Sequence, residues 1–223
     1  MPVVSAKSPS LADVIIPERI ERLTAIDNAK GRLNRLGVQI VNNYFASGDK
    51  YPDRDCTDAT WDRVMLAAAQ ASVLSVYFQD KASDFGRLWY SHIDPKRTWL
   101  NLPWMYRGAG AAGAMAYIGL GSLVDAAGIW AGKLRPGAVM QAWNVADDYY
   151  RVRNGDSVVG DPDIHYGHSF IFLNYVHSAT AITGMRIADN GFRGDWPFIT
   201  RGEFALWFGA NHNSGVPLTD LIY

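Results

Sequence analysis

The sequence is poor in cysteine and in net charge. It has one cysteine, Cys56, among 223 residues, and its formal net charge at pH 7 is −1. A single cysteine excludes a disulfide within the chain, so the fold does not depend on an oxidising compartment. A net charge this small gives no basic surface for nucleic acid or for an anionic membrane. We therefore expect neither nucleic acid nor a membrane as a partner.

Export and membrane signals are also missing. The N-terminal stretch MPVVSAKSPSLADVIIPERIERL has no basic start followed by an apolar core and a cleavage site, so we expect a protein made in the cytoplasm without a signal peptide. One long apolar run, residues 108–132, is nearly uncharged, but it is rich in glycine and contains Asp125. We predict a buried or groove-lining pair of short helices there rather than a membrane span.

What is present is a globular composition, with 48% hydrophobic and 13% aromatic residues. The length suggests a single domain, residues 1–223. Apolar spacing predicts a helix over residues 17–37, ended by Gly37, and a long buried helix that starts at Cys56. A helical insert is expected at about residues 81–132.

The second half of the chain changes from a helical to a strand pattern. Strands are predicted at KLRPGAVMQAW, HSFIFLNYV and SATAITGMRIADN, a long loop at about residues 147–167, and a loop with a short helix at GFRGDWPFITRGEFALWFGANH. Helices first and antiparallel strands afterwards are typical of the α+β class.

Cys56 is the first candidate for chemistry. It stands directly after Asp55, a good helix N-cap, and a helix N-terminus lowers the pKa of a thiol through its amides and its dipole. A thiolate nucleophile also needs a base and a residue that orients the base. A lone cysteine is, on the other hand, often only a small packed residue.

His168 is the candidate base, because it opens a predicted strand. The next strand ends in Asp189, on the same face as Met185 and Ile187. If the two strands are antiparallel neighbours, Asp189 or Asn190 can reach the imidazole. The sequence thus offers a cysteine, a histidine and an acidic or amide residue in that chain order.

A metal site is the competing interpretation of these polar residues. Its ligands would come from the set His165, His168, Asp161, Asp163 and Asp189. An H-x-x-H spacing at a loop-to-strand junction is not a familiar zinc geometry, and the chain has no second cysteine. We therefore predict no metal and no cofactor.

Several segments together resemble the NlpC-type cell-wall cysteine peptidases of the papain-like superfamily, which are related to the CHAP amidases. They are AKGRLNRLGVQIVNNY, FASGDKYPDR, DCTD, KLRPGAVMQAW, GHSFIFLNY and GMRIADNG, and in order they cover about residues 26–192. The resemblance implies a papain-like fold, with N-terminal helices packed on a small antiparallel sheet or half-barrel. It also implies Cys56 as nucleophile, His168 as general base, Asp189 or Asn190 as the orienting residue, and Tyr44 beside the oxyanion.

The chain departs from the family pattern at some points. Thr57 and Asp58 replace the usual serine and glycine after the cysteine, and ASG stands where tryptophan–glycine–glycine is usual. Cys56 and His168 are 112 positions apart, more than the compact family core requires. These departures leave the choice of substrate open.

The function implied by the resemblance is a cysteine endopeptidase or amidase that hydrolyses peptidoglycan stem peptides. Because we expect no export signal, we expect an antibacterial effector that a specialised secretion machine such as type VI carries to the periplasm of a target cell. In the producing cell, an immunity protein would neutralise it. The alternative is a papain-like transferase or deamidase that acts on a protein partner. A third hypothesis is a binding module whose site has decayed.

Overall fold

The structure is a computed structural model that describes residues 35–47, 56–70, 106–117, 121–154, 163, 167–190 and 198–212. Its helices are α3 (Arg35–Ser47), α4 (Cys56–Gln70), α6 (Gly110–Tyr117), α7 (Ala126–Trp130) and α8 (Ala146–Asn154). Its strands are β1 (Gly121–Val124), β2 (Val139–Trp143), β3 (His168–Ser178), β4 (Ala181–Ala188), β5 (Phe198–Thr200) and β6 (Leu206–His212). The expected α+β class is therefore present.

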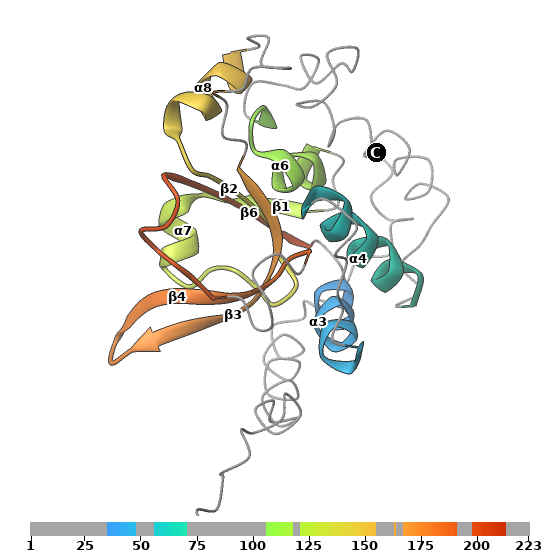
Figure 1. Cartoon of the computed structure of the whole chain (residues 1–223). Coiled ribbons are helices and arrows are strands. Elements are labelled where there is room, and N and C mark those ends of the chain that lie inside the picture. The colour runs from blue at the N-terminus through green and yellow to red at the C-terminus, as the bar shows by residue number, and fades with distance from the viewer. Residues whose placement is uncertain are drawn as a thin grey trace, which may run out of the picture.

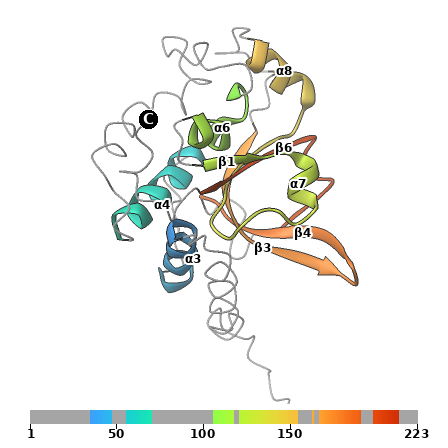
Figure 2. The same ribbon diagram turned by 180° about the vertical axis from the view of Figure 1, so that it is seen from behind.

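The strands form one antiparallel sheet of six, in the order β1-β6-β2-β3-β4-β5. Figures 1 and 2 show the sheet strongly bent, with α3, α4 and α6 along one side and α7 on the other. The sheet brings β3 and β4, which are consecutive in the chain, side by side, and it places β3 next to β2.

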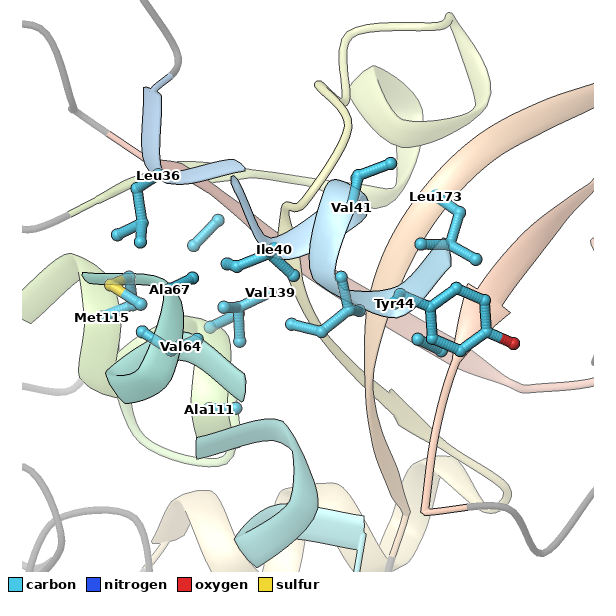
Figure 3. Packing of buried hydrophobic residues seen from close by; sticks show 14 residues of the cluster. Leu36, Ile40, Val41, Tyr44, Val64, Ala67, Ala111, Met115, Val139 and Leu173 are labelled. Carbon is cyan, nitrogen blue, oxygen red and sulfur yellow. The ribbon is translucent and has the colours of Figure 1, made fainter. Parts of the chain in front are cut away.

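Two apolar clusters cover the two faces of the sheet. The helix-side cluster packs α3, α4 and α6 on the sheet and consists of Leu36, Ile40, Val41, Tyr44, Val64, Ala67, Ala111, Ala112, Met115, Val139, Ile171, Leu173, Ala188 and Ala210 (Figure 3). The α7-side cluster consists of Ile129, Leu134, Ala138, Met140, Ala142, Phe170, Phe172, Met185, Ile187, Ile199, Phe204 and Trp207. Successive residues of a strand point to opposite faces, which is why Phe170 and Ile171 belong to different clusters.

The prediction for the C-terminal stretch was wrong, because the structure has the strands β5 and β6 where a loop and a short helix were expected. β6 lies between β1 and β2, and both of its faces are covered: Trp207 belongs to the α7-side cluster and Ala210 to the helix-side cluster. A strand buried on both faces loses the alternation of apolar and polar residues, so its pattern does not distinguish it from a buried helix.

The predicted helix end at Gly37 was also wrong. Helix α3 runs through Gly37 as far as Ser47. A Cβ on Gly137 would overlap the backbone of Gly37, so these two glycines bring α3 close to the turn before β2. Here glycine provides a close backbone approach rather than a helix stop.

The two segments that were expected to be inserts contain regular structure. Of the helical insert expected at about residues 81–132, residues 81–105 lie outside the described part. Residues 108–132 hold the short helices α6 and α7 as expected, but the edge strand β1 lies between them. The predicted loop at 147–167 begins with helix α8, while residues 155–162 and 164–166 lie outside the described part, as does most of the helix predicted at 17–37. None of the described helices is long and apolar enough to cross a bilayer.

Candidate active site

Helix α4 begins at Cys56, as the sequence suggested. The thiol is half-buried, and the first turn of a helix is where unpaired amides and the positive end of the dipole stabilise a thiolate. The rest of the helix anchors this position, because Ala59, Thr60 and Val64 are fully buried and the Thr60 hydroxyl donates a hydrogen bond of 2.8 Å to the Cys56 carbonyl. Asp55 and the side chains of Thr57 and Asp58 lie outside the described residues.

His168 is the first residue of β3, and its backbone is paired with Ala142 of β2. The imidazole lies on the same face of β3 as Phe170, and the two ring centroids are 5.5 Å apart. Its side chain keeps 15% exposure. The imidazole ring therefore packs against the ring of Phe170, and part of its surface remains open to solvent.

Asp189 follows the last residue of β4 directly. The pairing of Ile171 with Ala188 places Asp189 opposite Phe170, diagonally across the sheet from His168. Oδ2 of Asp189 lies 3.2 Å from Nε2 of His168, and the carboxylate is 1% exposed. The pairing of the two strands that the sequence interpretation required is thus present, and Asp189 reaches the imidazole.

The third contact of the imidazole is with Cys56. Burial lowers the pKa of His168, but hydrogen bonds to Asp189 and to Cys56, together with their negative charges, outweigh burial and raise the pKa from 6.5 to about 9. The structure therefore brings Cys56, His168 and Asp189 together in one line of contacts.

This arrangement favours a thiolate beside an imidazolium at neutral pH. A histidine with a pKa of about 9 carries a positive charge at pH 7, and this charge stabilises a neighbouring thiolate. The thiolate is a strong nucleophile, and the imidazolium is an acid within reach of it. The site thus holds a nucleophile and an acid side by side, the two groups that acyl transfer requires.

Tyr44 and Asn190 are the other two candidate site residues. Tyr44 lies in α3 within the helix-side cluster, its ring under the guanidinium of Arg63 at 5.9 Å, and Figure 3 shows its hydroxyl pointing away from the cluster. Asn190 follows Asp189, and its Oδ1 is buried. The contact seen at His168 involves Asp189, and the roles of Tyr44 and Asn190 stay predictions.

The residues of the alternative metal site are not assembled as ligands in the described structure. His168 and Asp189 are bonded to each other, and His165 and Asp161 lie outside the described residues. Among the residues that are described, no group of three or more histidine, cysteine or acidic side chains is placed to hold a metal ion.

Sequence reasoning missed a buried polar pair beside the site. Gln141 of β2 and Ser169 of β3 face each other, and the serine hydroxyl donates a hydrogen bond of 2.6 Å to Oε1 of the glutamine. The available signal was the glutamine itself, a polar residue in the apolar strand VMQAW, every residue of which is buried. A buried amide in such a strand requires a partner.

Comparisons of the chain with protein-family models, with curated proteins and with solved structures find no match. We therefore infer the function of the protein from the chemistry of the site and from the motifs in the sequence.

Proposed function

We propose that the protein is a cysteine hydrolase with a papain-like fold, in which Cys56 is the nucleophile, His168 the acid and base, and Asp189 the residue that orients the imidazole. The observation that carries the proposal is the position of His168, whose Nε2 lies 3.2 Å from Oδ2 of Asp189 and whose pKa is raised by its interactions with Asp189 and with Cys56 at the start of α4. A nucleophile at a helix start that meets a histidine on an antiparallel strand also supports the papain-like arrangement.

The reaction would proceed by acyl transfer. The Cys56 thiolate attacks the carbonyl carbon of an amide, and the backbone amide of Cys56 helps to hold the oxyanion. His168 gives its proton to the leaving nitrogen as the carbon–nitrogen bond breaks, which leaves a thioester on Cys56. His168 then takes a proton from water, the hydroxide attacks the thioester, and the acid product leaves while the thiolate is restored.

The proposed substrates are peptide bonds in peptidoglycan stem peptides. The support for this substrate class is the resemblance of AKGRLNRLGVQIVNNY, DCTD, KLRPGAVMQAW and GHSFIFLNY to the NlpC-type peptidases. The geometry at His168 supports the reaction type, and the motifs support the substrate. Each part therefore has its own test.

The test of the substrate is digestion of purified peptidoglycan by the wild type and by Cys56→Ala, with the released fragments identified by mass spectrometry. We expect defined fragments from the wild type and none from the variant. Intact peptidoglycan, together with modification of a glutamine or an amine on added proteins, would instead favour a transferase or deamidase.

The test of the reaction type does not depend on the substrate. A thiol-reactive probe should label wild-type Cys56 at mildly acidic pH, where an ordinary thiol is protonated. A decayed site would show only ordinary alkaline reactivity, and this outcome would overturn the proposed chemistry.

The effector role is proposed on the sequence motifs alone. If it is correct, the protein fused to an export signal should lyse a Gram-negative host from the periplasm, whereas the same protein kept in the cytoplasm should be harmless. Cys56→Ala with the export signal is the matched control. Equal toxicity of the exported wild type and variant would contradict this role.

A further inference from the structure

The buried pair of Gln141 and Ser169 lies one residue away from His168 along β3. Their Cα positions are paired in the register of β2 and β3, and the next pair is Ala142 with His168. The Ser169 hydroxyl donates to Oε1 of Gln141 at 2.6 Å, and Nε2 of Gln141 makes a longer contact of 3.4 Å with the Ala142 carbonyl. Both side chains are buried.

The surroundings of this pair are apolar. Val139 and Ile171, two residues away on the same face of the sheet, are fully buried in the helix-side cluster. Two polar side chains in such surroundings satisfy each other, and a hydrogen bond is electrostatically stronger there than in water. The hydrogen bond of this pair therefore joins β2 to β3 in one defined geometry, whereas the apolar contacts around it have no preferred direction.

The glutamine amide is held in place from two sides. A Cβ on Gly110, the first residue of α6, would overlap the amide group of Gln141. A Cβ on Gly167 would overlap the Ala142 carbonyl oxygen and lie 2.8 Å from Nε2 of Gln141. The side chain of Gln141 thus fills the space between the start of α6 and the residue that precedes His168.

His168 needs such support because it occupies the first position of its strand. Strand ends open more readily than strand centres. A small displacement of the imidazole would lengthen its bonds to both Asp189 and Cys56, and displacements of about 1 Å cost up to about 100-fold in rate in enzymes.

We propose that the hydrogen bond between Ser169 and Gln141 is a positioning device for His168. It holds the start of β3 on β2, so that the imidazole keeps its contact with Asp189 and its position beside the Cys56 thiol. Neither residue touches the reacting atoms, so both are positioning residues. The inference rests on the proposed pairing of Cys56 with His168.

The experiment measures the rate of Cys56 alkylation against pH, together with thermal unfolding. The variants are Ser169→Ala, Gln141→Leu, the double variant and His168→Ala. The control is Gln70→Ala, which removes the exposed hydrogen bonds that Oε1 of Gln70 accepts from Asn43 at 2.6 Å and from Gln39 at 3.2 Å, at the far end of α4 from Cys56. Alkylation needs no substrate, so it reports on the thiolate alone.

On the acidic limb of the wild-type pH profile, we expect each single variant to alkylate about tenfold more slowly, the change that corresponds to a rise of one unit in the pKa of the thiol, while Gln70→Ala matches the wild type. Each single change removes one hydrogen-bond partner of a buried polar group, whereas the double variant removes both groups, so its thermal stability should recover. A positioning role predicts that the alkylation rate of the double variant stays low despite this recovery.

The outcomes separate this inference from the proposed function. If His168→Ala slows the alkylation of Cys56 but both single variants alkylate at the wild-type rate, the positioning role is overturned and the proposed pairing of Cys56 with His168 is retained. If the rate recovers with stability in the double variant, the bond is merely structural and the inference is also overturned. If His168→Ala itself matches the wild type, the proposed function fails and the inference fails with it.

Discussion

Nε2 of His168 lies 3.2 Å from Oδ2 of Asp189, across the pairing of β3 with β4. The carboxylate is 1% exposed, so it acts on the imidazole from a site with little water to screen it. This contact contributes to the raised pKa of His168. It also makes the pH dependence of the site a direct test of the arrangement.

The alkaline limit of activity should follow His168. Its pKa of about 9 means that the imidazolium loses its proton as the pH rises through about 9, and the thiolate then loses its acid partner. Asp189→Asn keeps an acceptor oxygen but removes the negative charge, so the pKa of His168 should fall. We expect the alkaline limb of the rate profile to move to lower pH, and an unmoved limb would contradict the role of Asp189.

The same profile decides between the two candidate orienting residues. Asn190→Ala is the control for Asp189→Asn, because it alters the neighbouring side chain and leaves the carboxylate in place. We expect the alkaline limb of Asn190→Ala to coincide with that of the wild type. A larger shift in Asn190→Ala than in Asp189→Asn would transfer the orienting role to Asn190.

Tyr44→Phe tests the predicted oxyanion role. The ring that packs under Arg63 is retained, and only the hydroxyl is lost. Removal of one oxyanion donor typically costs about 100-fold in kcat, so we expect a loss of this order with the rate of Cys56 alkylation unchanged. An unchanged kcat would show that Tyr44 serves only the core.

Gly167→Ala should destabilise the fold and disturb His168, because the added Cβ would overlap the Ala142 carbonyl oxygen. The matched control is Gly202→Ala, whose Cβ would meet no atom within 4 Å. Thermal unfolding compares the two variants. Equal stability of both would show that the backbone before His168 does not need this close approach.

His212 should make the fold sensitive to acid. It is buried, and burial lowers its pKa to about 4, although a bond of 2.7 Å from Nε2 to the Gly137 carbonyl partly offsets this effect. The unfolded chain binds the proton with a pKa near 6.5, so this contribution to stability is complete above that pH and is lost as the pH falls from about 6.5 toward 4. The loss between pH 7 and pH 5 should be about 2 kcal/mol.

The measurement is the free energy of urea unfolding at pH 7 and at pH 5 for the wild type and for His212→Gln. The variant is expected to be less stable at pH 7, because the buried bond to Gly137 is altered, but its stability should fall less between the two pH values. An identical fall in both proteins would assign the acid sensitivity to other groups.

The elements that were predictable from the sequence are those set by local pattern. The start of α4 at Cys56 follows from its place after Asp55 and before an alanine-rich run, and β3 and β4 follow from strongly alternating, β-branched and aromatic segments. Because a strand places every second side chain on one face, the shared face of His168 and Phe170 was also foreseeable.

Other features depend on neighbours distant in the chain. β6 was missed because it is covered on both faces and shows no alternation, and Gly37 was misread because its neighbour is Gly137, a hundred positions further along. Gln141 and Ser169 are 28 positions apart, and only the register of β2 and β3 makes them partners.

Amino-acid order alone was enough to propose the three candidate residues, because a helix start and two strand ends are encoded by nearby residues. The contacts between them were decided by the folded sheet, which sets β4 beside β3 and brings the start of β3 to the start of α4. The physical reason is that local propensity acts over a few residues, whereas the pKa of His168 depends on charges and burial contributed by segments far apart in the chain.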